Sequence, residues 1–117
     1  MSGLDCSELH FLLDADGAII AFQEKAQSWA GALAFSREEN ARQFVESSHL
    51  EAAEIAAVAL SDRANVASLI AALKRRPIRY VLLDLDYHSG KCLQVDFEGD
   101  GFGPAQERQF TAEHHHG

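Results

Sequence analysis

The chain has 117 residues, of which 47% are hydrophobic and 24% charged, and its 18 acidic and 10 basic side chains give a formal net charge of −8. This composition predicts one folded domain rather than a disordered chain, and the negative charge disfavours nucleic acid and anionic membranes as partners. The sequence contains two widely spaced cysteines, Cys6 and Cys92, no basic-then-apolar leader and no apolar run of membrane-spanning length. We therefore expect a cytoplasmic protein with free thiols.

Two short apolar segments near the start predict a β-hairpin. Residues 9–13 and 18–22 are apolar, and residues 16–17 between them read Asp-Gly, which is typical of a type I′ turn. Such a turn requires positive φ at both of its central residues. In this register Leu13 faces Ile20.

A strand and two helices are expected next. A third strand is predicted over residues 32–35, and Ser36 and Glu39 have the spacing of a capping box at the start of a helix. After a fourth strand near residues 53–60, Asp62 is a candidate N-cap for a second helix. That helix is predicted from apolar residues at i, i+3, i+4 and i+7, which are Val66, Leu69, Ile70 and Leu73.

The last regular segment alternates apolar and polar residues with a period of two. It predicts a half-buried hairpin formed by strands over residues 78–87 and 93–97. A three-residue turn over residues 88–90 keeps the apolar faces together by pairing Leu85 with Leu93.

These elements, in the order ββ(β)αβαββ, predict an α+β (mixed α/β) fold. We expect one mixed sheet of five to six strands with both helices packed on one face. The single domain is expected to cover residues 1–100. Residues 101–117 begin with a segment rich in Gly and Pro and are expected to form a polar carboxyl-terminal tail.

One stretch resembles a known family. The segment Leu33-Ala34-Phe35-Ser36-Arg37-Glu38-Glu39, followed by a helix carrying Ala41 and Phe44, resembles the amino-terminal domain of SseB-like proteins over about residues 8–98. The resemblance implies a small bacterial domain whose role is protein interaction. It supplies no catalytic residue.

Acidic residues on the last hairpin are the candidate metal ligands. In the register above, Asp84, Asp86 and Asp96 share one face, and hard divalent cations such as Mg²⁺ and Ca²⁺ prefer several carboxylate oxygens. The same residues also fit the solvated face of an antiparallel hairpin. Cys92, with His88 and Asp86, has the residue types of a nucleophile, a base and an orienting acid, and this register places Cys92 opposite Asp86.

The leading functional prediction is a protein-interaction or regulatory module without catalytic activity or a cofactor, which binds a partner or forms a homodimer through a strand edge. Candidate contact residues are the aromatic side chains outside the regular elements, Trp29, Phe102 and Phe110. Two alternatives remain open. One is a divalent-metal-binding domain or metal-dependent enzyme, and the other is a small-ligand domain with a pocket beneath Trp29 and residues 24–31.

Overall fold

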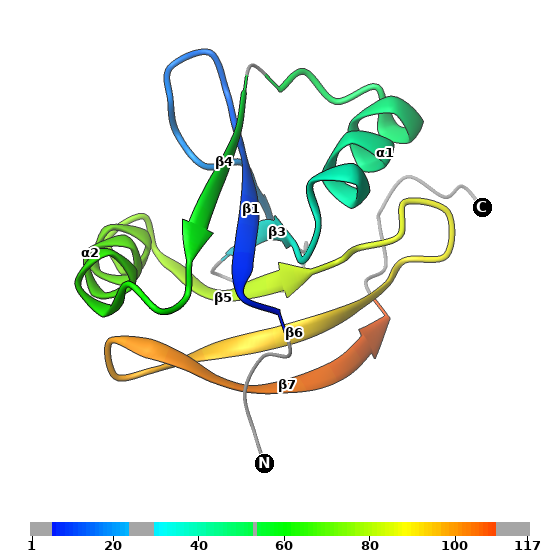
Figure 1. Cartoon of the computed structure of the whole chain (residues 1–117). Coiled ribbons are helices and arrows are strands. Elements are labelled where there is room, and N and C mark those ends of the chain that lie inside the picture. Colours follow the sequence, from blue (N-terminus) through cyan, green and yellow to red (C-terminus); the bar gives the residue numbers. More distant parts are fainter. Residues whose placement is uncertain (1–5, 24–29, 53, 110–117) are drawn as a thin grey trace.

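The computed structural model describes residues 6–23, 30–52 and 54–109. The elements in chain order are β1 (Glu8–Leu13), β2 (Ala21–Gln23), β3 (Ala30–Phe35), α1 (Glu38–Ser48), β4 (Glu54–Ala59), α2 (Arg63–Lys74), β5 (Ile78–Leu83), β6 (Lys91–Glu98) and β7 (Gly101–Gln109) (Figure 1). Within these ranges, no helix is both long and apolar enough to cross a membrane.

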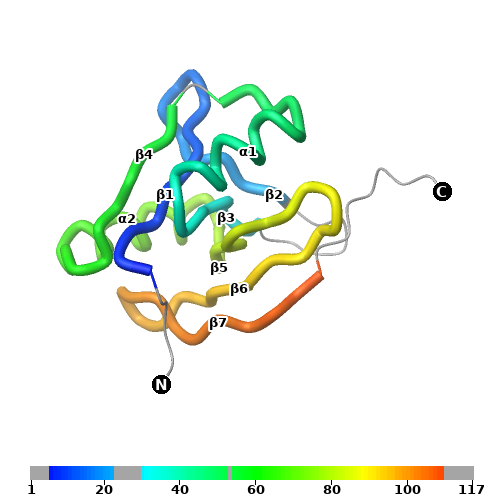
Figure 2. The backbone as a smooth tube through the Cα atoms, turned by 45° about the vertical axis from the view of Figure 1, so that its right-hand side comes forward, coloured from blue at the N-terminus to red at the C-terminus, as the bar shows by residue number. Residues whose placement is uncertain are grey.

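The strands form a mixed sheet, as expected for an α+β fold. Its order is β4-β1-β3-β5-β6-β7, with β2 beside β3. Strands β3 and β5 are parallel, and the other pairs are antiparallel. Figure 2 shows β4 and β7 at the two outer edges of this sheet.

The amino-terminal hairpin differs from its prediction. Residues 9–13 and 18–22 do not pair along their length, and one isolated bridge joins Leu13 to Ile19 rather than to Ile20. Gly17 has a positive φ of 82°, but Asp16 does not. The Asp14 carboxylate instead accepts hydrogen bonds from the backbone N–H groups two and four residues further on, at 2.9 and 3.0 Å. Strand β2 pairs with β3 instead of with β1.

The two helices cover opposite faces of the sheet, which corrects the expectation that both pack on one face. Leu33 and Phe35 of β3 belong to the core cluster that contains Phe44 of α1. Ala32 and Ala34 belong to the cluster that contains Leu73 of α2. Successive side chains of a strand point to opposite faces, so the helices lie on either side of β3.

Strand β5 pairs antiparallel with β6 as predicted, but it is buried on both faces rather than half-buried. Residues 80–83 are all buried because β5 packs on both faces, with Tyr80 and Leu82 in the α1 cluster and Val81 and Leu83 in the α2 cluster. Leu83 pairs with Leu93, two positions away from the predicted pairing of Leu85 with Leu93. The strand ends early because Asp84 adopts a left-handed conformation with φ 54°.

The expected tail is wrong for residues 101–109, which form β7 against β6. The register shifts between Val95 and Phe97, and Pro104 lies in this irregular stretch. Pro is tolerated in edge strands and at bulges because it does not then remove a ladder hydrogen bond. Residues 110–117 lie outside the described residues.

Helix α2 agrees with its predicted pattern. Val66, Ile70 and Leu73 are buried, and Leu69 packs against the same core. The Asp62 side chain accepts a hydrogen bond from the backbone N–H of Asn65, at 3.2 Å. The predicted N-cap is therefore confirmed.

Candidate functional site

Asp84, the first predicted metal ligand, connects the ends of two parallel strands. Its carboxylate accepts hydrogen bonds from the Ser36 backbone N–H at 2.9 Å, the Ser36 hydroxyl at 2.7 Å and the Asn40 amide at 3.3 Å. The Ser36 hydroxyl thus bonds to Asp84 and does not cap the amino terminus of α1. Arg37 is the N-cap of α1 and makes no side-chain capping bond, so the capping-box prediction is wrong.

Asp86 and Asp96 also have local partners. The Asp86 carboxylate accepts hydrogen bonds from the Ser89 hydroxyl at 2.9 Å and from the His88 backbone N–H at 3.1 Å. The Ser89 bond is the main cause that lowers the pKa of Asp86 below its ordinary value of 3.8. Asp96 accepts a hydrogen bond from the side-chain amide of Gln94, at 2.9 Å.

The structure does not bring the three aspartates to one site. Asp84 and Asp86 line a hollow of about 440 Å³ beside α1, whereas Asp96 lines a different hollow, of about 620 Å³, with Tyr80. The described residues contain no group of three or more side chains able to hold a metal ion. The observed β5–β6 register also differs by two residues from the one that sets Cys92 opposite Asp86.

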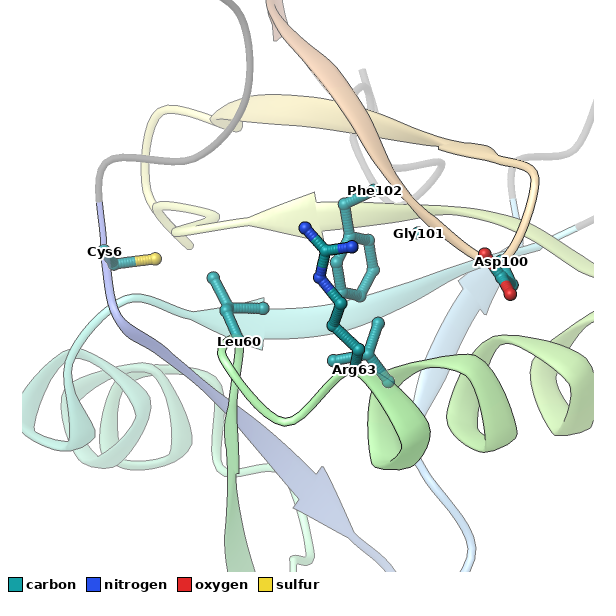
Figure 3. Close-up of a pocket in the computed structure, with 7 residues that line it drawn as sticks. Cys6, Leu60, Arg63, Asp100, Gly101 and Phe102 are labelled. Atoms are coloured by element: carbon teal, nitrogen blue, oxygen red, sulfur yellow. The ribbon is translucent and has the colours of Figure 1, made fainter.

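Of the three aromatic residues predicted to make contacts, Phe102 lies in the described part of the chain. It is half-buried, with its ring centroid 6.0 Å from that of Phe97. It lines a hollow of about 480 Å³ between the start of α2, the β6–β7 turn and the chain before β1. Figure 3 shows Arg63 and Phe102 among the side chains that line this hollow. The other two, Trp29 and Phe110, lie outside the described residues. So does the predicted pocket beneath residues 24–31, except for residues 30 and 31, which belong to β3.

A different feature, the outer edge of β4, has the properties of an interaction site. This strand reads Glu-Ile-Ala-Ala-Val-Ala and pairs, among the described residues, with β1 alone. All of its side chains are at least partly accessible to solvent. Five consecutive apolar residues therefore lie along one border of the sheet.

The pairing with β1 determines which backbone groups of β4 face away from the sheet. The Leu60 backbone N–H donates to the Ser7 carbonyl at 2.9 Å, just beyond the paired residues. In an antiparallel pair, inward- and outward-facing residues alternate. The even-numbered residues of β4 therefore bond to β1, while Ile55, Ala57 and Ala59 direct their N–H groups outward.

The other long edge of the sheet is protected, and β4 is not. Strand β7 carries Pro104, an irregular pairing register and the charged residues Glu107 and Arg108. These are devices by which proteins prevent an edge strand from accepting another strand. Strand β4 contains no Pro, Lys or Arg, and its one charged residue, Glu54, lies at its first position.

A shallow groove of about 430 Å³ runs between β4 and α1. Its apolar lining consists of Val45, Ala52 and Ile55, and its polar lining consists of Glu38, Arg42, Glu46 and Glu54. Arg42 forms an ion pair with Glu38, one turn away on α1. A strand added at the β4 edge would lie beside this groove, whose apolar lining includes Ile55.

Sequence reasoning did not single out the β4 edge. The apolar run from Ile55 to Ala59 was visible, but a buried central strand has the same appearance.

Comparisons with family models, with curated proteins and with solved structures found no match to this chain.

Proposed function

We propose that this protein is an interaction module that binds an extended polypeptide segment as an additional strand on β4. The observation that carries the proposal is the outward-facing backbone of Ile55 and Ala57 on an apolar edge whose one charged residue, Glu54, lies at its first position. Strand addition of this kind obtains affinity from main-chain hydrogen bonds and specificity from side-chain contacts beside the edge. A role in protein interaction is also what the resemblance to SseB-like domains implies.

The energetics favour an occupied edge. Each main-chain hydrogen bond contributes about 0.5–1.5 kcal/mol net, so a pairing of four to six bonds stabilises a complex by several kcal/mol before the cost of association. Burial of the apolar atoms of Ile55 and Val58 adds about 25 cal/mol for each Å² removed from water. An uncovered apolar edge is, by contrast, a site of aggregation.

Photo-crosslinking tests the proposal at single-residue resolution. A benzophenone side chain is placed at Ala57, which is exposed on β4, and the matched control places it at Gln106, which is exposed on β7. The protein is irradiated in cells that express it, and the crosslinked peptide is identified by mass spectrometry. We expect one defined adduct at position 57 and none at position 106. An equal yield at both positions, or no adduct at position 57, would overturn the proposal.

A further inference from the structure

We infer that the segment bound by β4 is the β4 strand of a second copy of this chain, paired antiparallel about a twofold axis at Ala57. This inference rests on the proposed function and names its partner. The pairing is isologous, so the same surface serves both copies and the assembly closes as a dimer. It joins the two sheets edge to edge.

Backbone geometry selects the register. Residues Ile55, Ala57 and Ala59 face outward, and a hydrogen-bonded antiparallel pair requires outward-facing residues opposite each other. Pairing about Ala57 sets Ala57 opposite itself and Ile55 opposite Ala59, so that all three outward N–H groups of each copy are used. A centre at Ala56 pairs Ile55 with Ala57 and leaves Ala59 without a partner on the other β4. A centre at Val58 pairs Ala57 with Ala59 and leaves Ile55 without one.

The side chains match in the same register. On the face shared with α1, the pairs are Ile55 with Ala59 and Ala57 with Ala57. On the face shared with α2, Ala56 lies opposite Val58. All five residues are apolar, so both faces of the new strand pair bring apolar against apolar. The small side chains of the three alanines allow this close approach without obstruction.

The distribution of charge favours the antiparallel direction. The only charged residue of β4, Glu54, lies at its first position, and Glu51 precedes it. A parallel pairing would set Glu54 near Glu54 of the other copy, which is destabilising for like charges. The antiparallel pairing places the two Glu54 residues at opposite ends, each opposite Leu60. A chain of net charge −8 thus makes its contact along a strand that carries one charged residue.

Disulfide trapping tests the register. In a background of Cys6→Ser and Cys92→Ala, the variant Ala57→Cys is oxidised mildly. Residues directly opposite in a hydrogen-bonded pair have Cα atoms about 5.5 Å apart, which suits a disulfide. We expect Ala57→Cys to form covalent dimer at least tenfold faster than the exposed control Gln106→Cys. Ile55→Cys and Ala59→Cys should each crosslink slowly alone and rapidly when mixed.

The outcomes separate the inference from the proposed function. Rapid trapping of Ile55→Cys with Ala57→Cys, and not of Ala57→Cys with itself, would overturn the register. No trapping in any combination, together with a photo-crosslink from position 57 to a different protein, would overturn self-pairing and leave the proposed function standing. No trapping and no photo-crosslink at position 57 would overturn both. Thermal unfolding of each cysteine variant checks that it is folded.

Discussion

The carboxylate of Asp84 accepts hydrogen bonds from both the backbone N–H and the hydroxyl of Ser36, which lies 48 positions earlier in the chain. Ser36 directly follows β3 and Asp84 directly follows β5, so this contact ties together the ends of the two parallel central strands. It also explains why a residue first considered as a metal ligand is held in a left-handed conformation, with φ 54°.

Replacing Asp84 should destabilise the fold. Asp84→Ala removes three hydrogen bonds to a carboxylate and places alanine at a positive φ, so we expect a loss of about 3 kcal/mol in the free energy of unfolding. Asp84→Asn retains an acceptor for Ser36 and tolerates the conformation, so about 1 kcal/mol is expected. Urea denaturation measures both. Asp96→Ala, on the exposed face of β6, is the control, and an equal loss there would contradict this account.

Gly31 is required by the packing of Tyr80. A Cβ atom added at Gly31 would lie 2.7 Å from Cδ1 of Tyr80 and 2.9 Å from Cγ of Leu82, both of which are buried. Gly31→Ala should therefore cost about 1–3 kcal/mol of stability. At Gly101, also in the sheet, the nearest atom to an added Cβ is 3.9 Å away, so Gly101→Ala should change stability by less than about 0.5 kcal/mol. Similar losses in both variants, measured by thermal unfolding, would argue against this packing.

The Asp86 carboxyl should titrate below 3.8, chiefly because the Ser89 hydroxyl donates to its charged form. Since the folded-state pKa is lowered, the stability contributed by this bond is fully present above pH 3.8 and is lost as the pH falls through the lower folded-state pKa. Ser89→Ala should raise the titration midpoint of Asp86 in carboxyl NMR. Ser48→Ala, whose hydroxyl bonds to the Phe44 carbonyl, should leave it unchanged. A midpoint insensitive to Ser89→Ala would exclude this hydrogen bond as the cause.

A charge placed on the β4 edge should weaken self-association. Ala57→Lys sets two lysines opposite each other at the proposed twofold axis, and this repulsion should raise the dimer dissociation constant at least tenfold in sedimentation equilibrium. Gln106→Lys adds the same charge to β7 and should leave the dissociation constant within about twofold. If both variants shift it equally, net charge rather than the β4 edge controls association.

Local patterns predicted helix α2 correctly. The apolar repeat of Val66, Leu69, Ile70 and Leu73 and the cap at Asp62 located α2 because both act within a few residues. The capping box at Ser36 was wrong because a tertiary partner, Asp84, competes for the same hydroxyl. A sequence pattern that spans one helical turn cannot reveal a hydrogen bond between residues 48 positions apart, such as Ser36 and Asp84.

The remaining differences arise from topology. Residues 80–83 resemble a half-buried strand, but both faces of β5 are buried, one in the core cluster that contains Phe44 of α1 and the other in the cluster that contains Leu73 of α2. The polar, Pro-containing residues 101–109 resemble a tail because an edge strand needs little apolar surface. The β4 site could not be predicted because the amino-acid sequence does not show which strand lies at the border of the sheet. An apolar strand becomes an interaction site through its place at the border of the sheet, which strand order decides.

Amide hydrogen exchange along β4, measured by NMR over a series of protein concentrations, tests the central claim most directly. At low concentration the inward N–H groups of Ala56 and Val58 should exchange slowly, and the outward N–H groups of Ile55 and Ala57 should exchange fast. Raising the concentration should slow exchange at Ile55 and Ala57, and Ala57→Lys should abolish that slowing at Ile55. Exchange at Ile55 and Ala57 that is independent of concentration would contradict pairing of β4 with a second copy.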